Sequence, residues 1–357
     1  MSIPETMQAA RWHGPGSKIL IEEVPVPDPG PGELLIRVAA CGVCASDLHM
    51  FDGSLPTRGP VPVIPGHEAA GTVVQVGVGS TGWSEGDAAA IFAGVGCGDC
   101  PACQQGKEVE QCWLAKCLGI DRDGAWAEYI VVPAVNCVKV PEGVPLEQAA
   151  ILCDAVGTPY NAVLDAGNLR AGESVAVFGI GGLGTHGVAL AKLAGASTII
   201  AVDPLPAARE RAVKLGADHA LDPTEGNAAK KIKELTGWRG VDLAIDFVGV
   251  NAVLKQAVSS LALDGRCILV GVSGERIELG PSVMFAGLRS TLRGIMGYRR
   301  EHLEKLVELV AAGRLDVSGS ITHRFDLADA EAAVHTLSDK SGSVVRVVLI
   351  PPASSPS

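Results

Sequence analysis

Four cysteines stand close together in the stretch CGDCPACQQGKEVEQC: Cys97, Cys100, Cys103 and Cys112. Four thiolates at this spacing can close a tetrahedral Zn²⁺ site that leaves no coordination position for a substrate. A site of that kind holds a loop in place and does no chemistry. The pattern therefore predicts one structural zinc.

A second set of zinc-binding residues is spread more widely along the chain. Cys44 lies in CGVCASDLH, His67 in PGHE and Cys153 in ILCDAVGTPY. Three protein ligands with a vacant fourth position describe a catalytic zinc, which acts on an alcohol as a Lewis acid because Zn²⁺ is redox-inert. Other interpretations exist for each residue: Cys44 with Cys41 as a redox pair, His67 as a buried structural histidine, and Cys153 as an inert core thiol.

Polar residues beside these ligands suit proton transfer from an alcohol. Ser46 can take the hydroxyl proton, and His49 can pass it to solvent, because imidazole exchanges protons near neutral pH. Asp47 is a candidate to orient the ring of His67. Glu68 follows a ligand directly and is a further candidate that exchanges onto the metal.

A glycine-rich run follows the apolar segment 175–178 and precedes an amphipathic segment: Gly179, Ile180, Gly181, Gly182, Leu183 and Gly184. This is GxGxxG in the strand–turn–helix context that a dinucleotide requires, although an ordinary turn can use the same glycines. Asp203 ends the next apolar segment, where a carboxylate bonds to ribose hydroxyls and repels a 2′-phosphate. We therefore expect NAD, with a helix N-cap as the alternative role of Asp203.

The elements that must position these residues fall into two patterns. Residues 1–153 contain short apolar runs, such as 34–40 and 70–76, broken by Gly and Pro, which predicts a β-rich domain with both zinc sites. Residues 154–293 alternate apolar strands with helical segments, which predicts a doubly wound parallel sheet and an α/β fold. Residues 294–357, with a helix at 301–312 and a strand at 343–350, should return to the first domain.

Composition excludes several classes of function. The chain has 357 residues, 47% hydrophobic and 19% charged, with a net charge of −11 and no basic cluster, so we expect neither nucleic acid nor membrane as a partner. Ten cysteines in a chain of this length indicate metal binding and a reducing compartment more than a disulfide framework. With no signal peptide and no apolar run of spanning length, a cytoplasmic protein is expected.

The motifs CGVCASDLH, PGHEAAGTV, GAWAEY, GIGGLG, LGADHALD and SGSVVRVVL, with the four-cysteine loop, resemble the medium-chain zinc-dependent alcohol dehydrogenase family over nearly the whole length. The resemblance implies a GroES-like catalytic domain and a Rossmann domain that binds NAD(P). It also implies catalytic ligands at Cys44, His67 and Cys153 and a relay through Ser46 and His49. Further residues implied to contact the cofactor are Arg346 at the phosphates and Val248, Val270 and Val272 at the nicotinamide.

The sequence departs from the family pattern at three places: one extra residue between Cys103 and Cys112, a basic residue displaced to Arg209, and Ala93 where many members carry an aromatic. The expected activity is reversible hydride transfer from an alcohol to NAD⁺, giving an aldehyde or ketone. A polyol dehydrogenase of the same fold is the alternative; such members often use a carboxylate as third ligand, against which Cys153 argues. A non-catalytic NAD-binding protein is a remote alternative, and a homo-oligomer, tetramer before dimer, is expected to pair near residues 277–293.

Overall fold

The computed structural model describes residues 3–55, 57–107, 109–339 and 342–352, which form two compact units. The first unit contains Met1–Ala155, Arg299–Asp339 and Arg346–Ser357, and the second contains Val156–Tyr298 and Lys340–Val345. The sequence predicted the boundaries at 153/154 and 293/294. The chain instead leaves the first unit after Ala155 and returns at Arg299, and it visits the second unit once more at 340–345.

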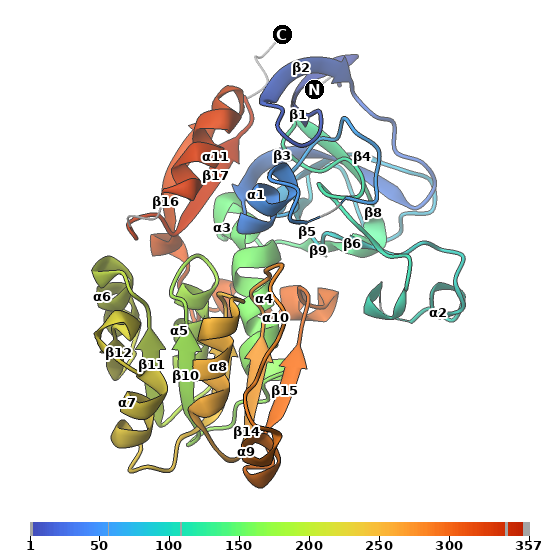
Figure 1. The fold of residues 1–357 in the computed structure, drawn as a ribbon. Helices are drawn as coiled ribbons and strands as arrows, with labels where there is room; N and C mark the ends of the chain where they lie inside the picture. Colours follow the sequence, from blue (N-terminus) through green and yellow to red (C-terminus); the bar gives the residue numbers. More distant parts are fainter. Residues whose placement is uncertain (1–2, 56, 108, 340–341, 353–357) are drawn as a thin grey trace. The chain divides into compact units, whose positions relative to one another are not determined.

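The first unit is built around a seven-stranded sheet in which β3 is the central strand (Figure 1). β3 pairs with β4, β8 and β17, all antiparallel, and most of its residues are buried, so it carries an almost continuous apolar run. The final strand of the chain therefore belongs to this unit. The strands are β1 (Thr6–Trp12), β2 (Ile19–Pro25), β3 (Glu33–Val43), β4 (Ala69–Val76), β5 (Ala88–Ile91), β6 (Gly94–Val95), β7 (Lys116–Cys117), β8 (Tyr129–Pro133), β9 (Cys137–Lys139), β16 (Ile321–Asp326) and β17 (Arg346–Ile350).

Helices of the first unit are short apart from α10. They are α1 (Ala45–Phe51), α2 (Pro101–Gln104), α3 (Leu146–Ile151), α10 (Arg300–Ala311) and α11 (Ala330–Ser338). α3 packs against β3 and β4 and runs directly into a π-helical segment, Leu152–Val156. π-Helical turns are rare and are found mostly at functional sites. Two of the residues singled out from the sequence meet here: Cys153 belongs to the π-helical segment, and Glu68 accepts a hydrogen bond from Ala155 N of the same segment.

The second unit is a six-stranded parallel sheet with the order β12-β11-β10-β13-β14-β15. The strand order reverses between β10 and β13, and ligands of such sheets bind beyond the carboxyl ends of the strands at this switch point. The strands are β10 (Ser174–Phe178), β11 (Thr198–Val202), β12 (His219–Leu221), β13 (Val241–Asp246), β14 (Leu261–Leu269) and β15 (Thr291–Gly294). The predicted doubly wound sheet is confirmed.

Helices cover both faces of this sheet (Figure 1). Ala176 and Phe178 of β10 pack into one core cluster with residues of α7 and α8, whereas Gly187 of α5 lies against Val177, on the opposite face of the same strand. The helices are α4 (Gly157–Tyr160), α5 (Gly184–Leu193), α6 (Pro206–Lys214), α7 (Ala228–Leu235), α8 (Asn251–Ser259) and α9 (Ser282–Gly287).

All ten cysteines are free thiols. Within the described ranges, no helix combines the length and the apolar character that crossing a bilayer requires.

Candidate metal centres and dinucleotide site

The four cysteines of the predicted structural site lie together in the loop around α2. The ligand atoms of Cys97, Cys100, Cys103 and Cys112 are all within 4.8 Å of one another. Backbone N–H groups already point at sulfur: Cys100 N donates to Cys97 Sγ at 3.3 Å, and Cys97 N donates to Cys112 Sγ at 3.4 Å. The latter bond is the main cause that lowers the pKa of the Cys112 thiol to about 7. The extra residue before Cys112 is absorbed by the loop, and the set fits a closed Zn²⁺ site.

Cys44 and Ser46 are placed by the turn from β3 into α1. Cys44 is the N-cap of α1 with extended backbone, and its N–H donates to Asp47 Oδ2 at 2.8 Å. The Ser46 hydroxyl lies 3.1 Å from Cys44 Sγ and 3.2 Å from His67 Nε2. One short turn thus fixes a sulfur ligand, a hydroxyl and a carboxylate with respect to each other.

His67 follows a glycine that no other residue could replace. Gly66 has φ +97°, and a Cβ added there would lie 2.2 Å from the ring of Trp126. Asp47 Oδ1 stands 3.4 Å from His67 Nδ1, which leaves Nε2 for the site, as predicted for a carboxylate behind a metal-binding histidine. Burial disfavours the imidazolium, but the carboxylates of Asp47 and Asp154 raise the pKa of His67 well above its ordinary value.

The third member of this group is Asp154, and the prediction of Cys153 as the third ligand is wrong. Cys44, His67 and Asp154 offer ligand atoms within 4.8 Å of one another, with Asp154 Oδ2 at 3.0 Å from Cys44 Sγ. Cys153 Sγ is turned toward the carbonyls of Ala69 and Ala149, both 3.3 Å away, and burial raises the pKa of its thiol well above the ordinary value. Neighbouring residues on a helical segment point about 100° apart, so only one of the two can face the group.

Cys44, His67 and Asp154 fit a zinc ion. Zn²⁺ takes thiolate, imidazole and carboxylate ligands at roughly 2.0–2.3 Å, so tetrahedral ligands should stand about 3.3–3.8 Å apart. His67 Nε2 lies 3.8 Å from Asp154 Oδ2, close to that separation. Burial disfavours the charged carboxylate, yet the His67 side chain lowers the pKa of Asp154 far below its usual range, so this ligand is ionised.

Glu68 and Arg346 form a buried ion pair behind the three ligands. Arg346 Nε lies 3.2 Å from Glu68 Oε1, and its Nη2 lies 3.2 Å from Asp154 Oδ2. Arg346 is only 2% exposed, and its guanidinium lies against these two carboxylates. Its contact with the cofactor phosphates stays a prediction. Burial raises the pKa of Glu68 to about 8 despite Arg346, and Glu68 stands outside the three-ligand group in this structure.

Of the two predicted relay residues, the structure joins one to the metal group. His49 Nδ1 pairs with the Ser54 hydroxyl at 2.9 Å, and within the described part of the chain no hydrogen bond connects it to Ser46. Ser46 contacts two of the ligands, as given above. The proton path predicted from Ser46 to His49 is therefore not continuous in this structure.

The glycine run folds as a dinucleotide loop between β10 and α5. A Cβ on Gly184 would lie 1.8 Å from the carbonyl oxygen of Gly179, and Gly179 has φ +82°, so both positions require glycine. A Cβ on Gly181 would meet nothing within 4 Å, so this backbone is open to a pyrophosphate. The N–H groups at the start of α5 add a favourable dipole for phosphate.

Asp203 lies just after β11 and is tied to the glycine loop. Its Oδ2 accepts from Ile180 N at 2.7 Å and its Oδ1 from Leu205 N at 2.8 Å, which leaves further lone pairs for ribose hydroxyls. Arg211 was missed from the sequence: Nη2 donates to Ile180 O at 2.5 Å, and Nε donates to Thr185 Oγ1 at 3.0 Å. Nothing in its spacing marks it, because it reaches the loop from α6. Arg209, in contrast, pairs with Asp222 at 2.9 Å.

The three predicted nicotinamide-pocket valines follow β13 and β14, the two strands beyond the switch point. Val248 and Val272 are partly exposed and Val270 is buried. The two loops press together, since a Cβ on Gly249 would lie 2.4 Å from Gly271 O. Asp246 ends β13 earlier than predicted because its Oδ1 accepts from Val248 N and Gly249 N.

Comparisons with known proteins agree with both units. Residues 30–142 match the model of the alcohol dehydrogenase GroES-like domain, and residues 182–312 match that of the zinc-binding dehydrogenases. L-Threonine 3-dehydrogenase of Pyrococcus horikoshii is 36% identical over 96% of this chain and 98% of its own length. Sorbitol dehydrogenase of Bacillus subtilis is 32% identical over 98% and 99%.

Solved structures show the same relationship. A zinc-binding dehydrogenase from Sinorhizobium meliloti, bound to NADP, superposes with a TM-score of 0.88 at 30% identity, covering 98% of this chain and 100% of the other. The GroES-like domain and the zinc-binding dehydrogenase domain that this chain matches are those expected from its motifs. The chain therefore belongs to the medium-chain zinc-dependent alcohol dehydrogenase family.

Proposed function

We propose that this chain catalyses the reversible, NAD⁺-dependent oxidation of an alcohol at the group formed by Cys44, His67 and Asp154. The observation that carries the proposal is the set of one sulfur, one imidazole nitrogen and one carboxylate oxygen within 4.8 Å, with the Ser46 hydroxyl beside them. Three protein ligands leave the fourth position of a tetrahedral ion to a substrate.

Each residue has a distinct role in this mechanism. Bound zinc supplies a Lewis acid that favours loss of the substrate's hydroxyl proton. Asp47 holds the His67 ring so that Nε2 faces the site, and Ser46, in contact with Cys44 and His67, accepts the proton that leaves the alcohol. The onward transfer from Ser46 to solvent through His49 stays a prediction, because no hydrogen bond among the described residues joins these two side chains. Bound NAD⁺ would supply the hydride acceptor, so that oxidation of the alcohol at its carbinol carbon would be balanced by reduction of the nicotinamide.

NAD is proposed over NADP because of Asp203. Its carboxylate follows β11, and Oδ2 accepts from Ile180 N of the glycine loop, beside which the adenosine ribose of a dinucleotide lies in folds of this kind. A 2′-phosphate would meet this negative charge. Arg209, the cation that could offset it, is engaged by Asp222.

A second candidate substrate is an alcohol with a neighbouring polar group, such as a polyol or a hydroxy amino acid. The presence of Asp154 as the third ligand removes the argument that Cys153 raised against this class. The relatives named for threonine and for sorbitol support it as well. Both candidates use the same metal group and cofactor and differ only in what surrounds the carbinol.

Metal analysis and a substrate panel test the proposal. We expect about two zinc ions per chain and NADH formation, followed by its absorbance, with at least one member of a panel that includes ethanol, 2-butanol, 2,3-butanediol, sorbitol and L-threonine. A preference for the last three compounds selects the second candidate. Two zinc ions with no NADH from any alcohol would instead support the non-catalytic alternative.

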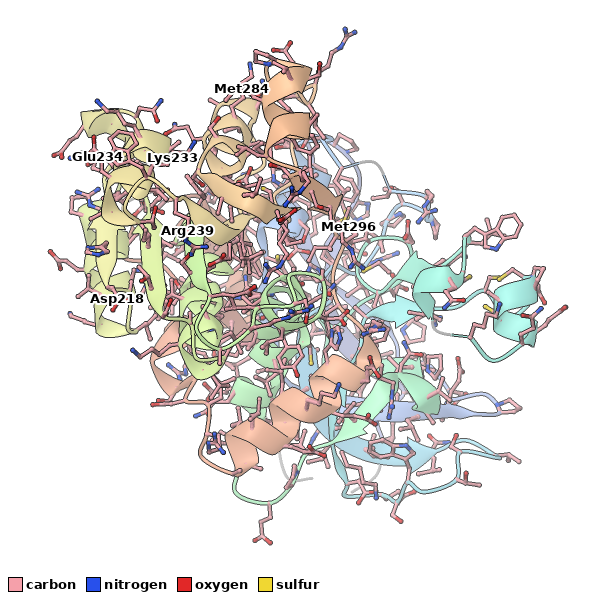
Figure 2. The ribbon with its side chains drawn as sticks, turned by 90° about the horizontal axis from the view of Figure 1, so that it is seen from below. Asp218, Lys233, Glu234, Arg239, Met284 and Met296 are labelled. Atoms are coloured by element: carbon pink, nitrogen blue, oxygen red, sulfur yellow. The ribbon has the colours of Figure 1, made fainter. Side chains whose placement is uncertain are left out.

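We also propose that the chain forms a homo-oligomer through the edge of the second unit. β15 is an edge strand, and near it Ile277, Val283, Met284 and Met296 are 57–76% exposed; the two methionines are labelled in Figure 2. Exposed apolar side chains near an edge strand favour pairing with a second copy. Light scattering measures the molar mass in solution, and we expect Met296→Lys to give a smaller assembly than wild type.

We propose a cytoplasmic location as well, because ten free thiols suit a reducing compartment.

A further inference from the structure

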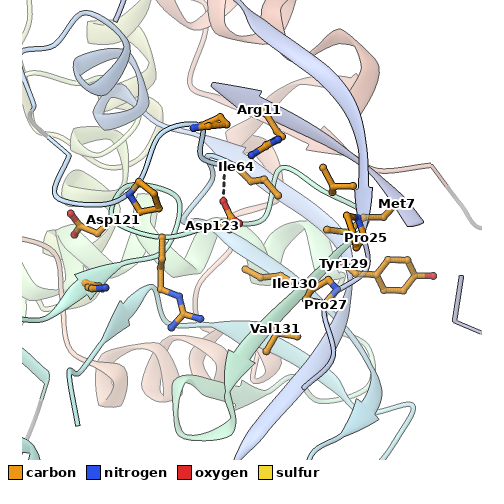
Figure 3. A pocket seen from close by; sticks show the side chains of 16 residues that line it. Met7, Arg11, Pro25, Pro27, Ile64, Asp121, Asp123, Tyr129, Ile130 and Val131 are labelled. Atoms are coloured by element: carbon orange, nitrogen blue, oxygen red, sulfur yellow. Dashed lines mark hydrogen bonds between the residues drawn. The ribbon is translucent and has the colours of Figure 1, made fainter. Parts of the chain in front are cut away.

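The first unit contains a cavity of about 690 Å³ that includes no residue of the metal group (Figure 3). It lies between β1, β2, β8, β7 and the loop that follows β7; residue 116 of β7 and residues 121–124 of that loop belong to its lining. Cavities of roughly 300–1,000 Å³ are typical of sites for small molecules. The proposed dehydrogenase mechanism gives this cavity no role.

Part of the wall is apolar and rigid. Three apolar residues of this wall are each about 95% buried: Met7, Ile64 and Ile130. Four prolines complete the wall: Pro25, Pro27, Pro60 and Pro62. Asp123 Oδ1 accepts from Ile64 N at 2.9 Å, the bond drawn in Figure 3, and Gly124 N donates to Ile64 O at 2.7 Å. The walls are therefore fixed before any ligand arrives, which lowers the entropic cost of binding.

Charged residues of the lining fall into two groups. Arg11 pairs with Glu22 at 2.9 Å, Asp121 accepts N–H groups from Arg58 and Cys117, and Asp123 is bonded as above. Lys116 and Arg122 also line the cavity, but neither side chain has an ion-pair or hydrogen-bond partner among the residues that the structure describes. Both cations are therefore available to an anion that enters the cavity.

We propose that this cavity binds a small amphipathic carboxylate, with its apolar body against the Ile64 and proline wall and its head group at Arg122 and Lys116. Arginine matches a carboxylate with two parallel N–H···O bonds, and lysine adds a point charge. The acidic side chains of the lining already accept backbone N–H groups. The anion therefore meets cations that are available and carboxylates that are not.

Isothermal titration of the zinc-loaded protein with octanoate, without cofactor, tests the proposal. We expect one saturable site per chain and at least tenfold weaker binding of octanamide, which has the same chain and no charge. The double variant Lys116→Gln, Arg122→Gln keeps the aliphatic stems and should bind octanoate at least tenfold more weakly. Lys18→Ala removes an exposed lysine of the same unit that does not line the cavity, and should bind as wild type.

A photoreactive octanoate analogue followed by peptide mapping gives the location independently. Labelling within 116–131 and 24–27 is the expected result. Absence of saturable binding, equal binding by the double variant, or labelling confined to 44–49 together with loss of binding in Asp154→Asn would each overturn the proposal. The last result would place the carboxylate at the metal group.

Discussion

Substituting Asp154 and Cys153 one at a time shows which of the two neighbours is a metal ligand and which is a core thiol. Asp154→Asn keeps the shape of the side chain and removes its charge, whereas Cys153→Ala removes a thiol that contacts Ala69 and Ala149. We expect Asp154→Asn to lose one of two zinc ions and almost all turnover. Cys153→Ala should keep both ions and lose only packing.

The size of the effect follows from the contacts of Asp154. Mutating residues that only support metal ligands costs about 10–100-fold in affinity, so loss of a ligand charge should cost at least about 100-fold, or roughly 2.7 kcal/mol. Arg346 Nη2 is 3.2 Å from Asp154, a gross attraction of roughly 5 kcal/mol at an effective dielectric constant of about 20. Because Arg346 keeps Glu68 as a partner, we expect the metal-free variant to unfold only about 1–3 kcal/mol more easily.

The assay measures zinc per chain after dialysis, competition with a chromophoric chelator, and NADH formation with the best alcohol of the panel. Chemical denaturation of both variants reports the free energy of unfolding. Cys153→Ala should lose about 1–2 kcal/mol of stability through a small cavity and retain wild-type metal content. One result refutes the reasoning: Asp154→Asn keeps two zinc ions and normal turnover, whereas Cys153→Ala holds one zinc ion and has no turnover.

Four further outcomes are expected. Asp203→Gly should shift the NAD-to-NADP ratio of kcat/KM toward NADP by roughly tenfold or more, because it removes a charge opposite a 2′-phosphate; an unchanged ratio would rule out that role. Gly184→Ala should destabilise the protein by about 2 kcal/mol or more, since its Cβ would lie 1.8 Å from a carbonyl oxygen. Gly181→Ala, which meets nothing within 4 Å, should unfold like wild type and bind NAD⁺ more weakly in a fluorescence titration. The Arg239 guanidinium is the main cause that lowers the pKa of Asp242 in the folded state, so the stability that Asp242→Asn loses, about 1–2 kcal/mol at pH 7, should shrink as the pH falls below about 4; a loss that is constant from pH 7 to pH 3 would contradict this.

The second unit could be predicted almost element by element because its sequence pattern is local. Fully buried parallel strands such as β10 are continuous apolar runs, and glycines end them in a turn that only one family of loops uses. Asp203 was found in the same way, since it must end the strand after the loop. Arg211 was not, because its contact with Ile180 comes from the far side of α6 and depends on helix packing that no spacing records.

In the metal group, residue spacing predicts some of the side chains correctly but not the third ligand. Cys44, Ser46, Asp47 and His67 are set by one turn and one glycine, so their sequence motifs carry the geometry with them. The third ligand comes from a helix, where the choice between two adjacent ligand-type residues is decided by the rotation of that helix against β3 and β4. Residue preference favoured Cys153, but packing turns its thiol toward the carbonyl of Ala149, four residues earlier, and thereby turns Asp154 toward Cys44. The same rotation gives Arg346 a second carboxylate, which accounts for the burial of its guanidinium near the ligands.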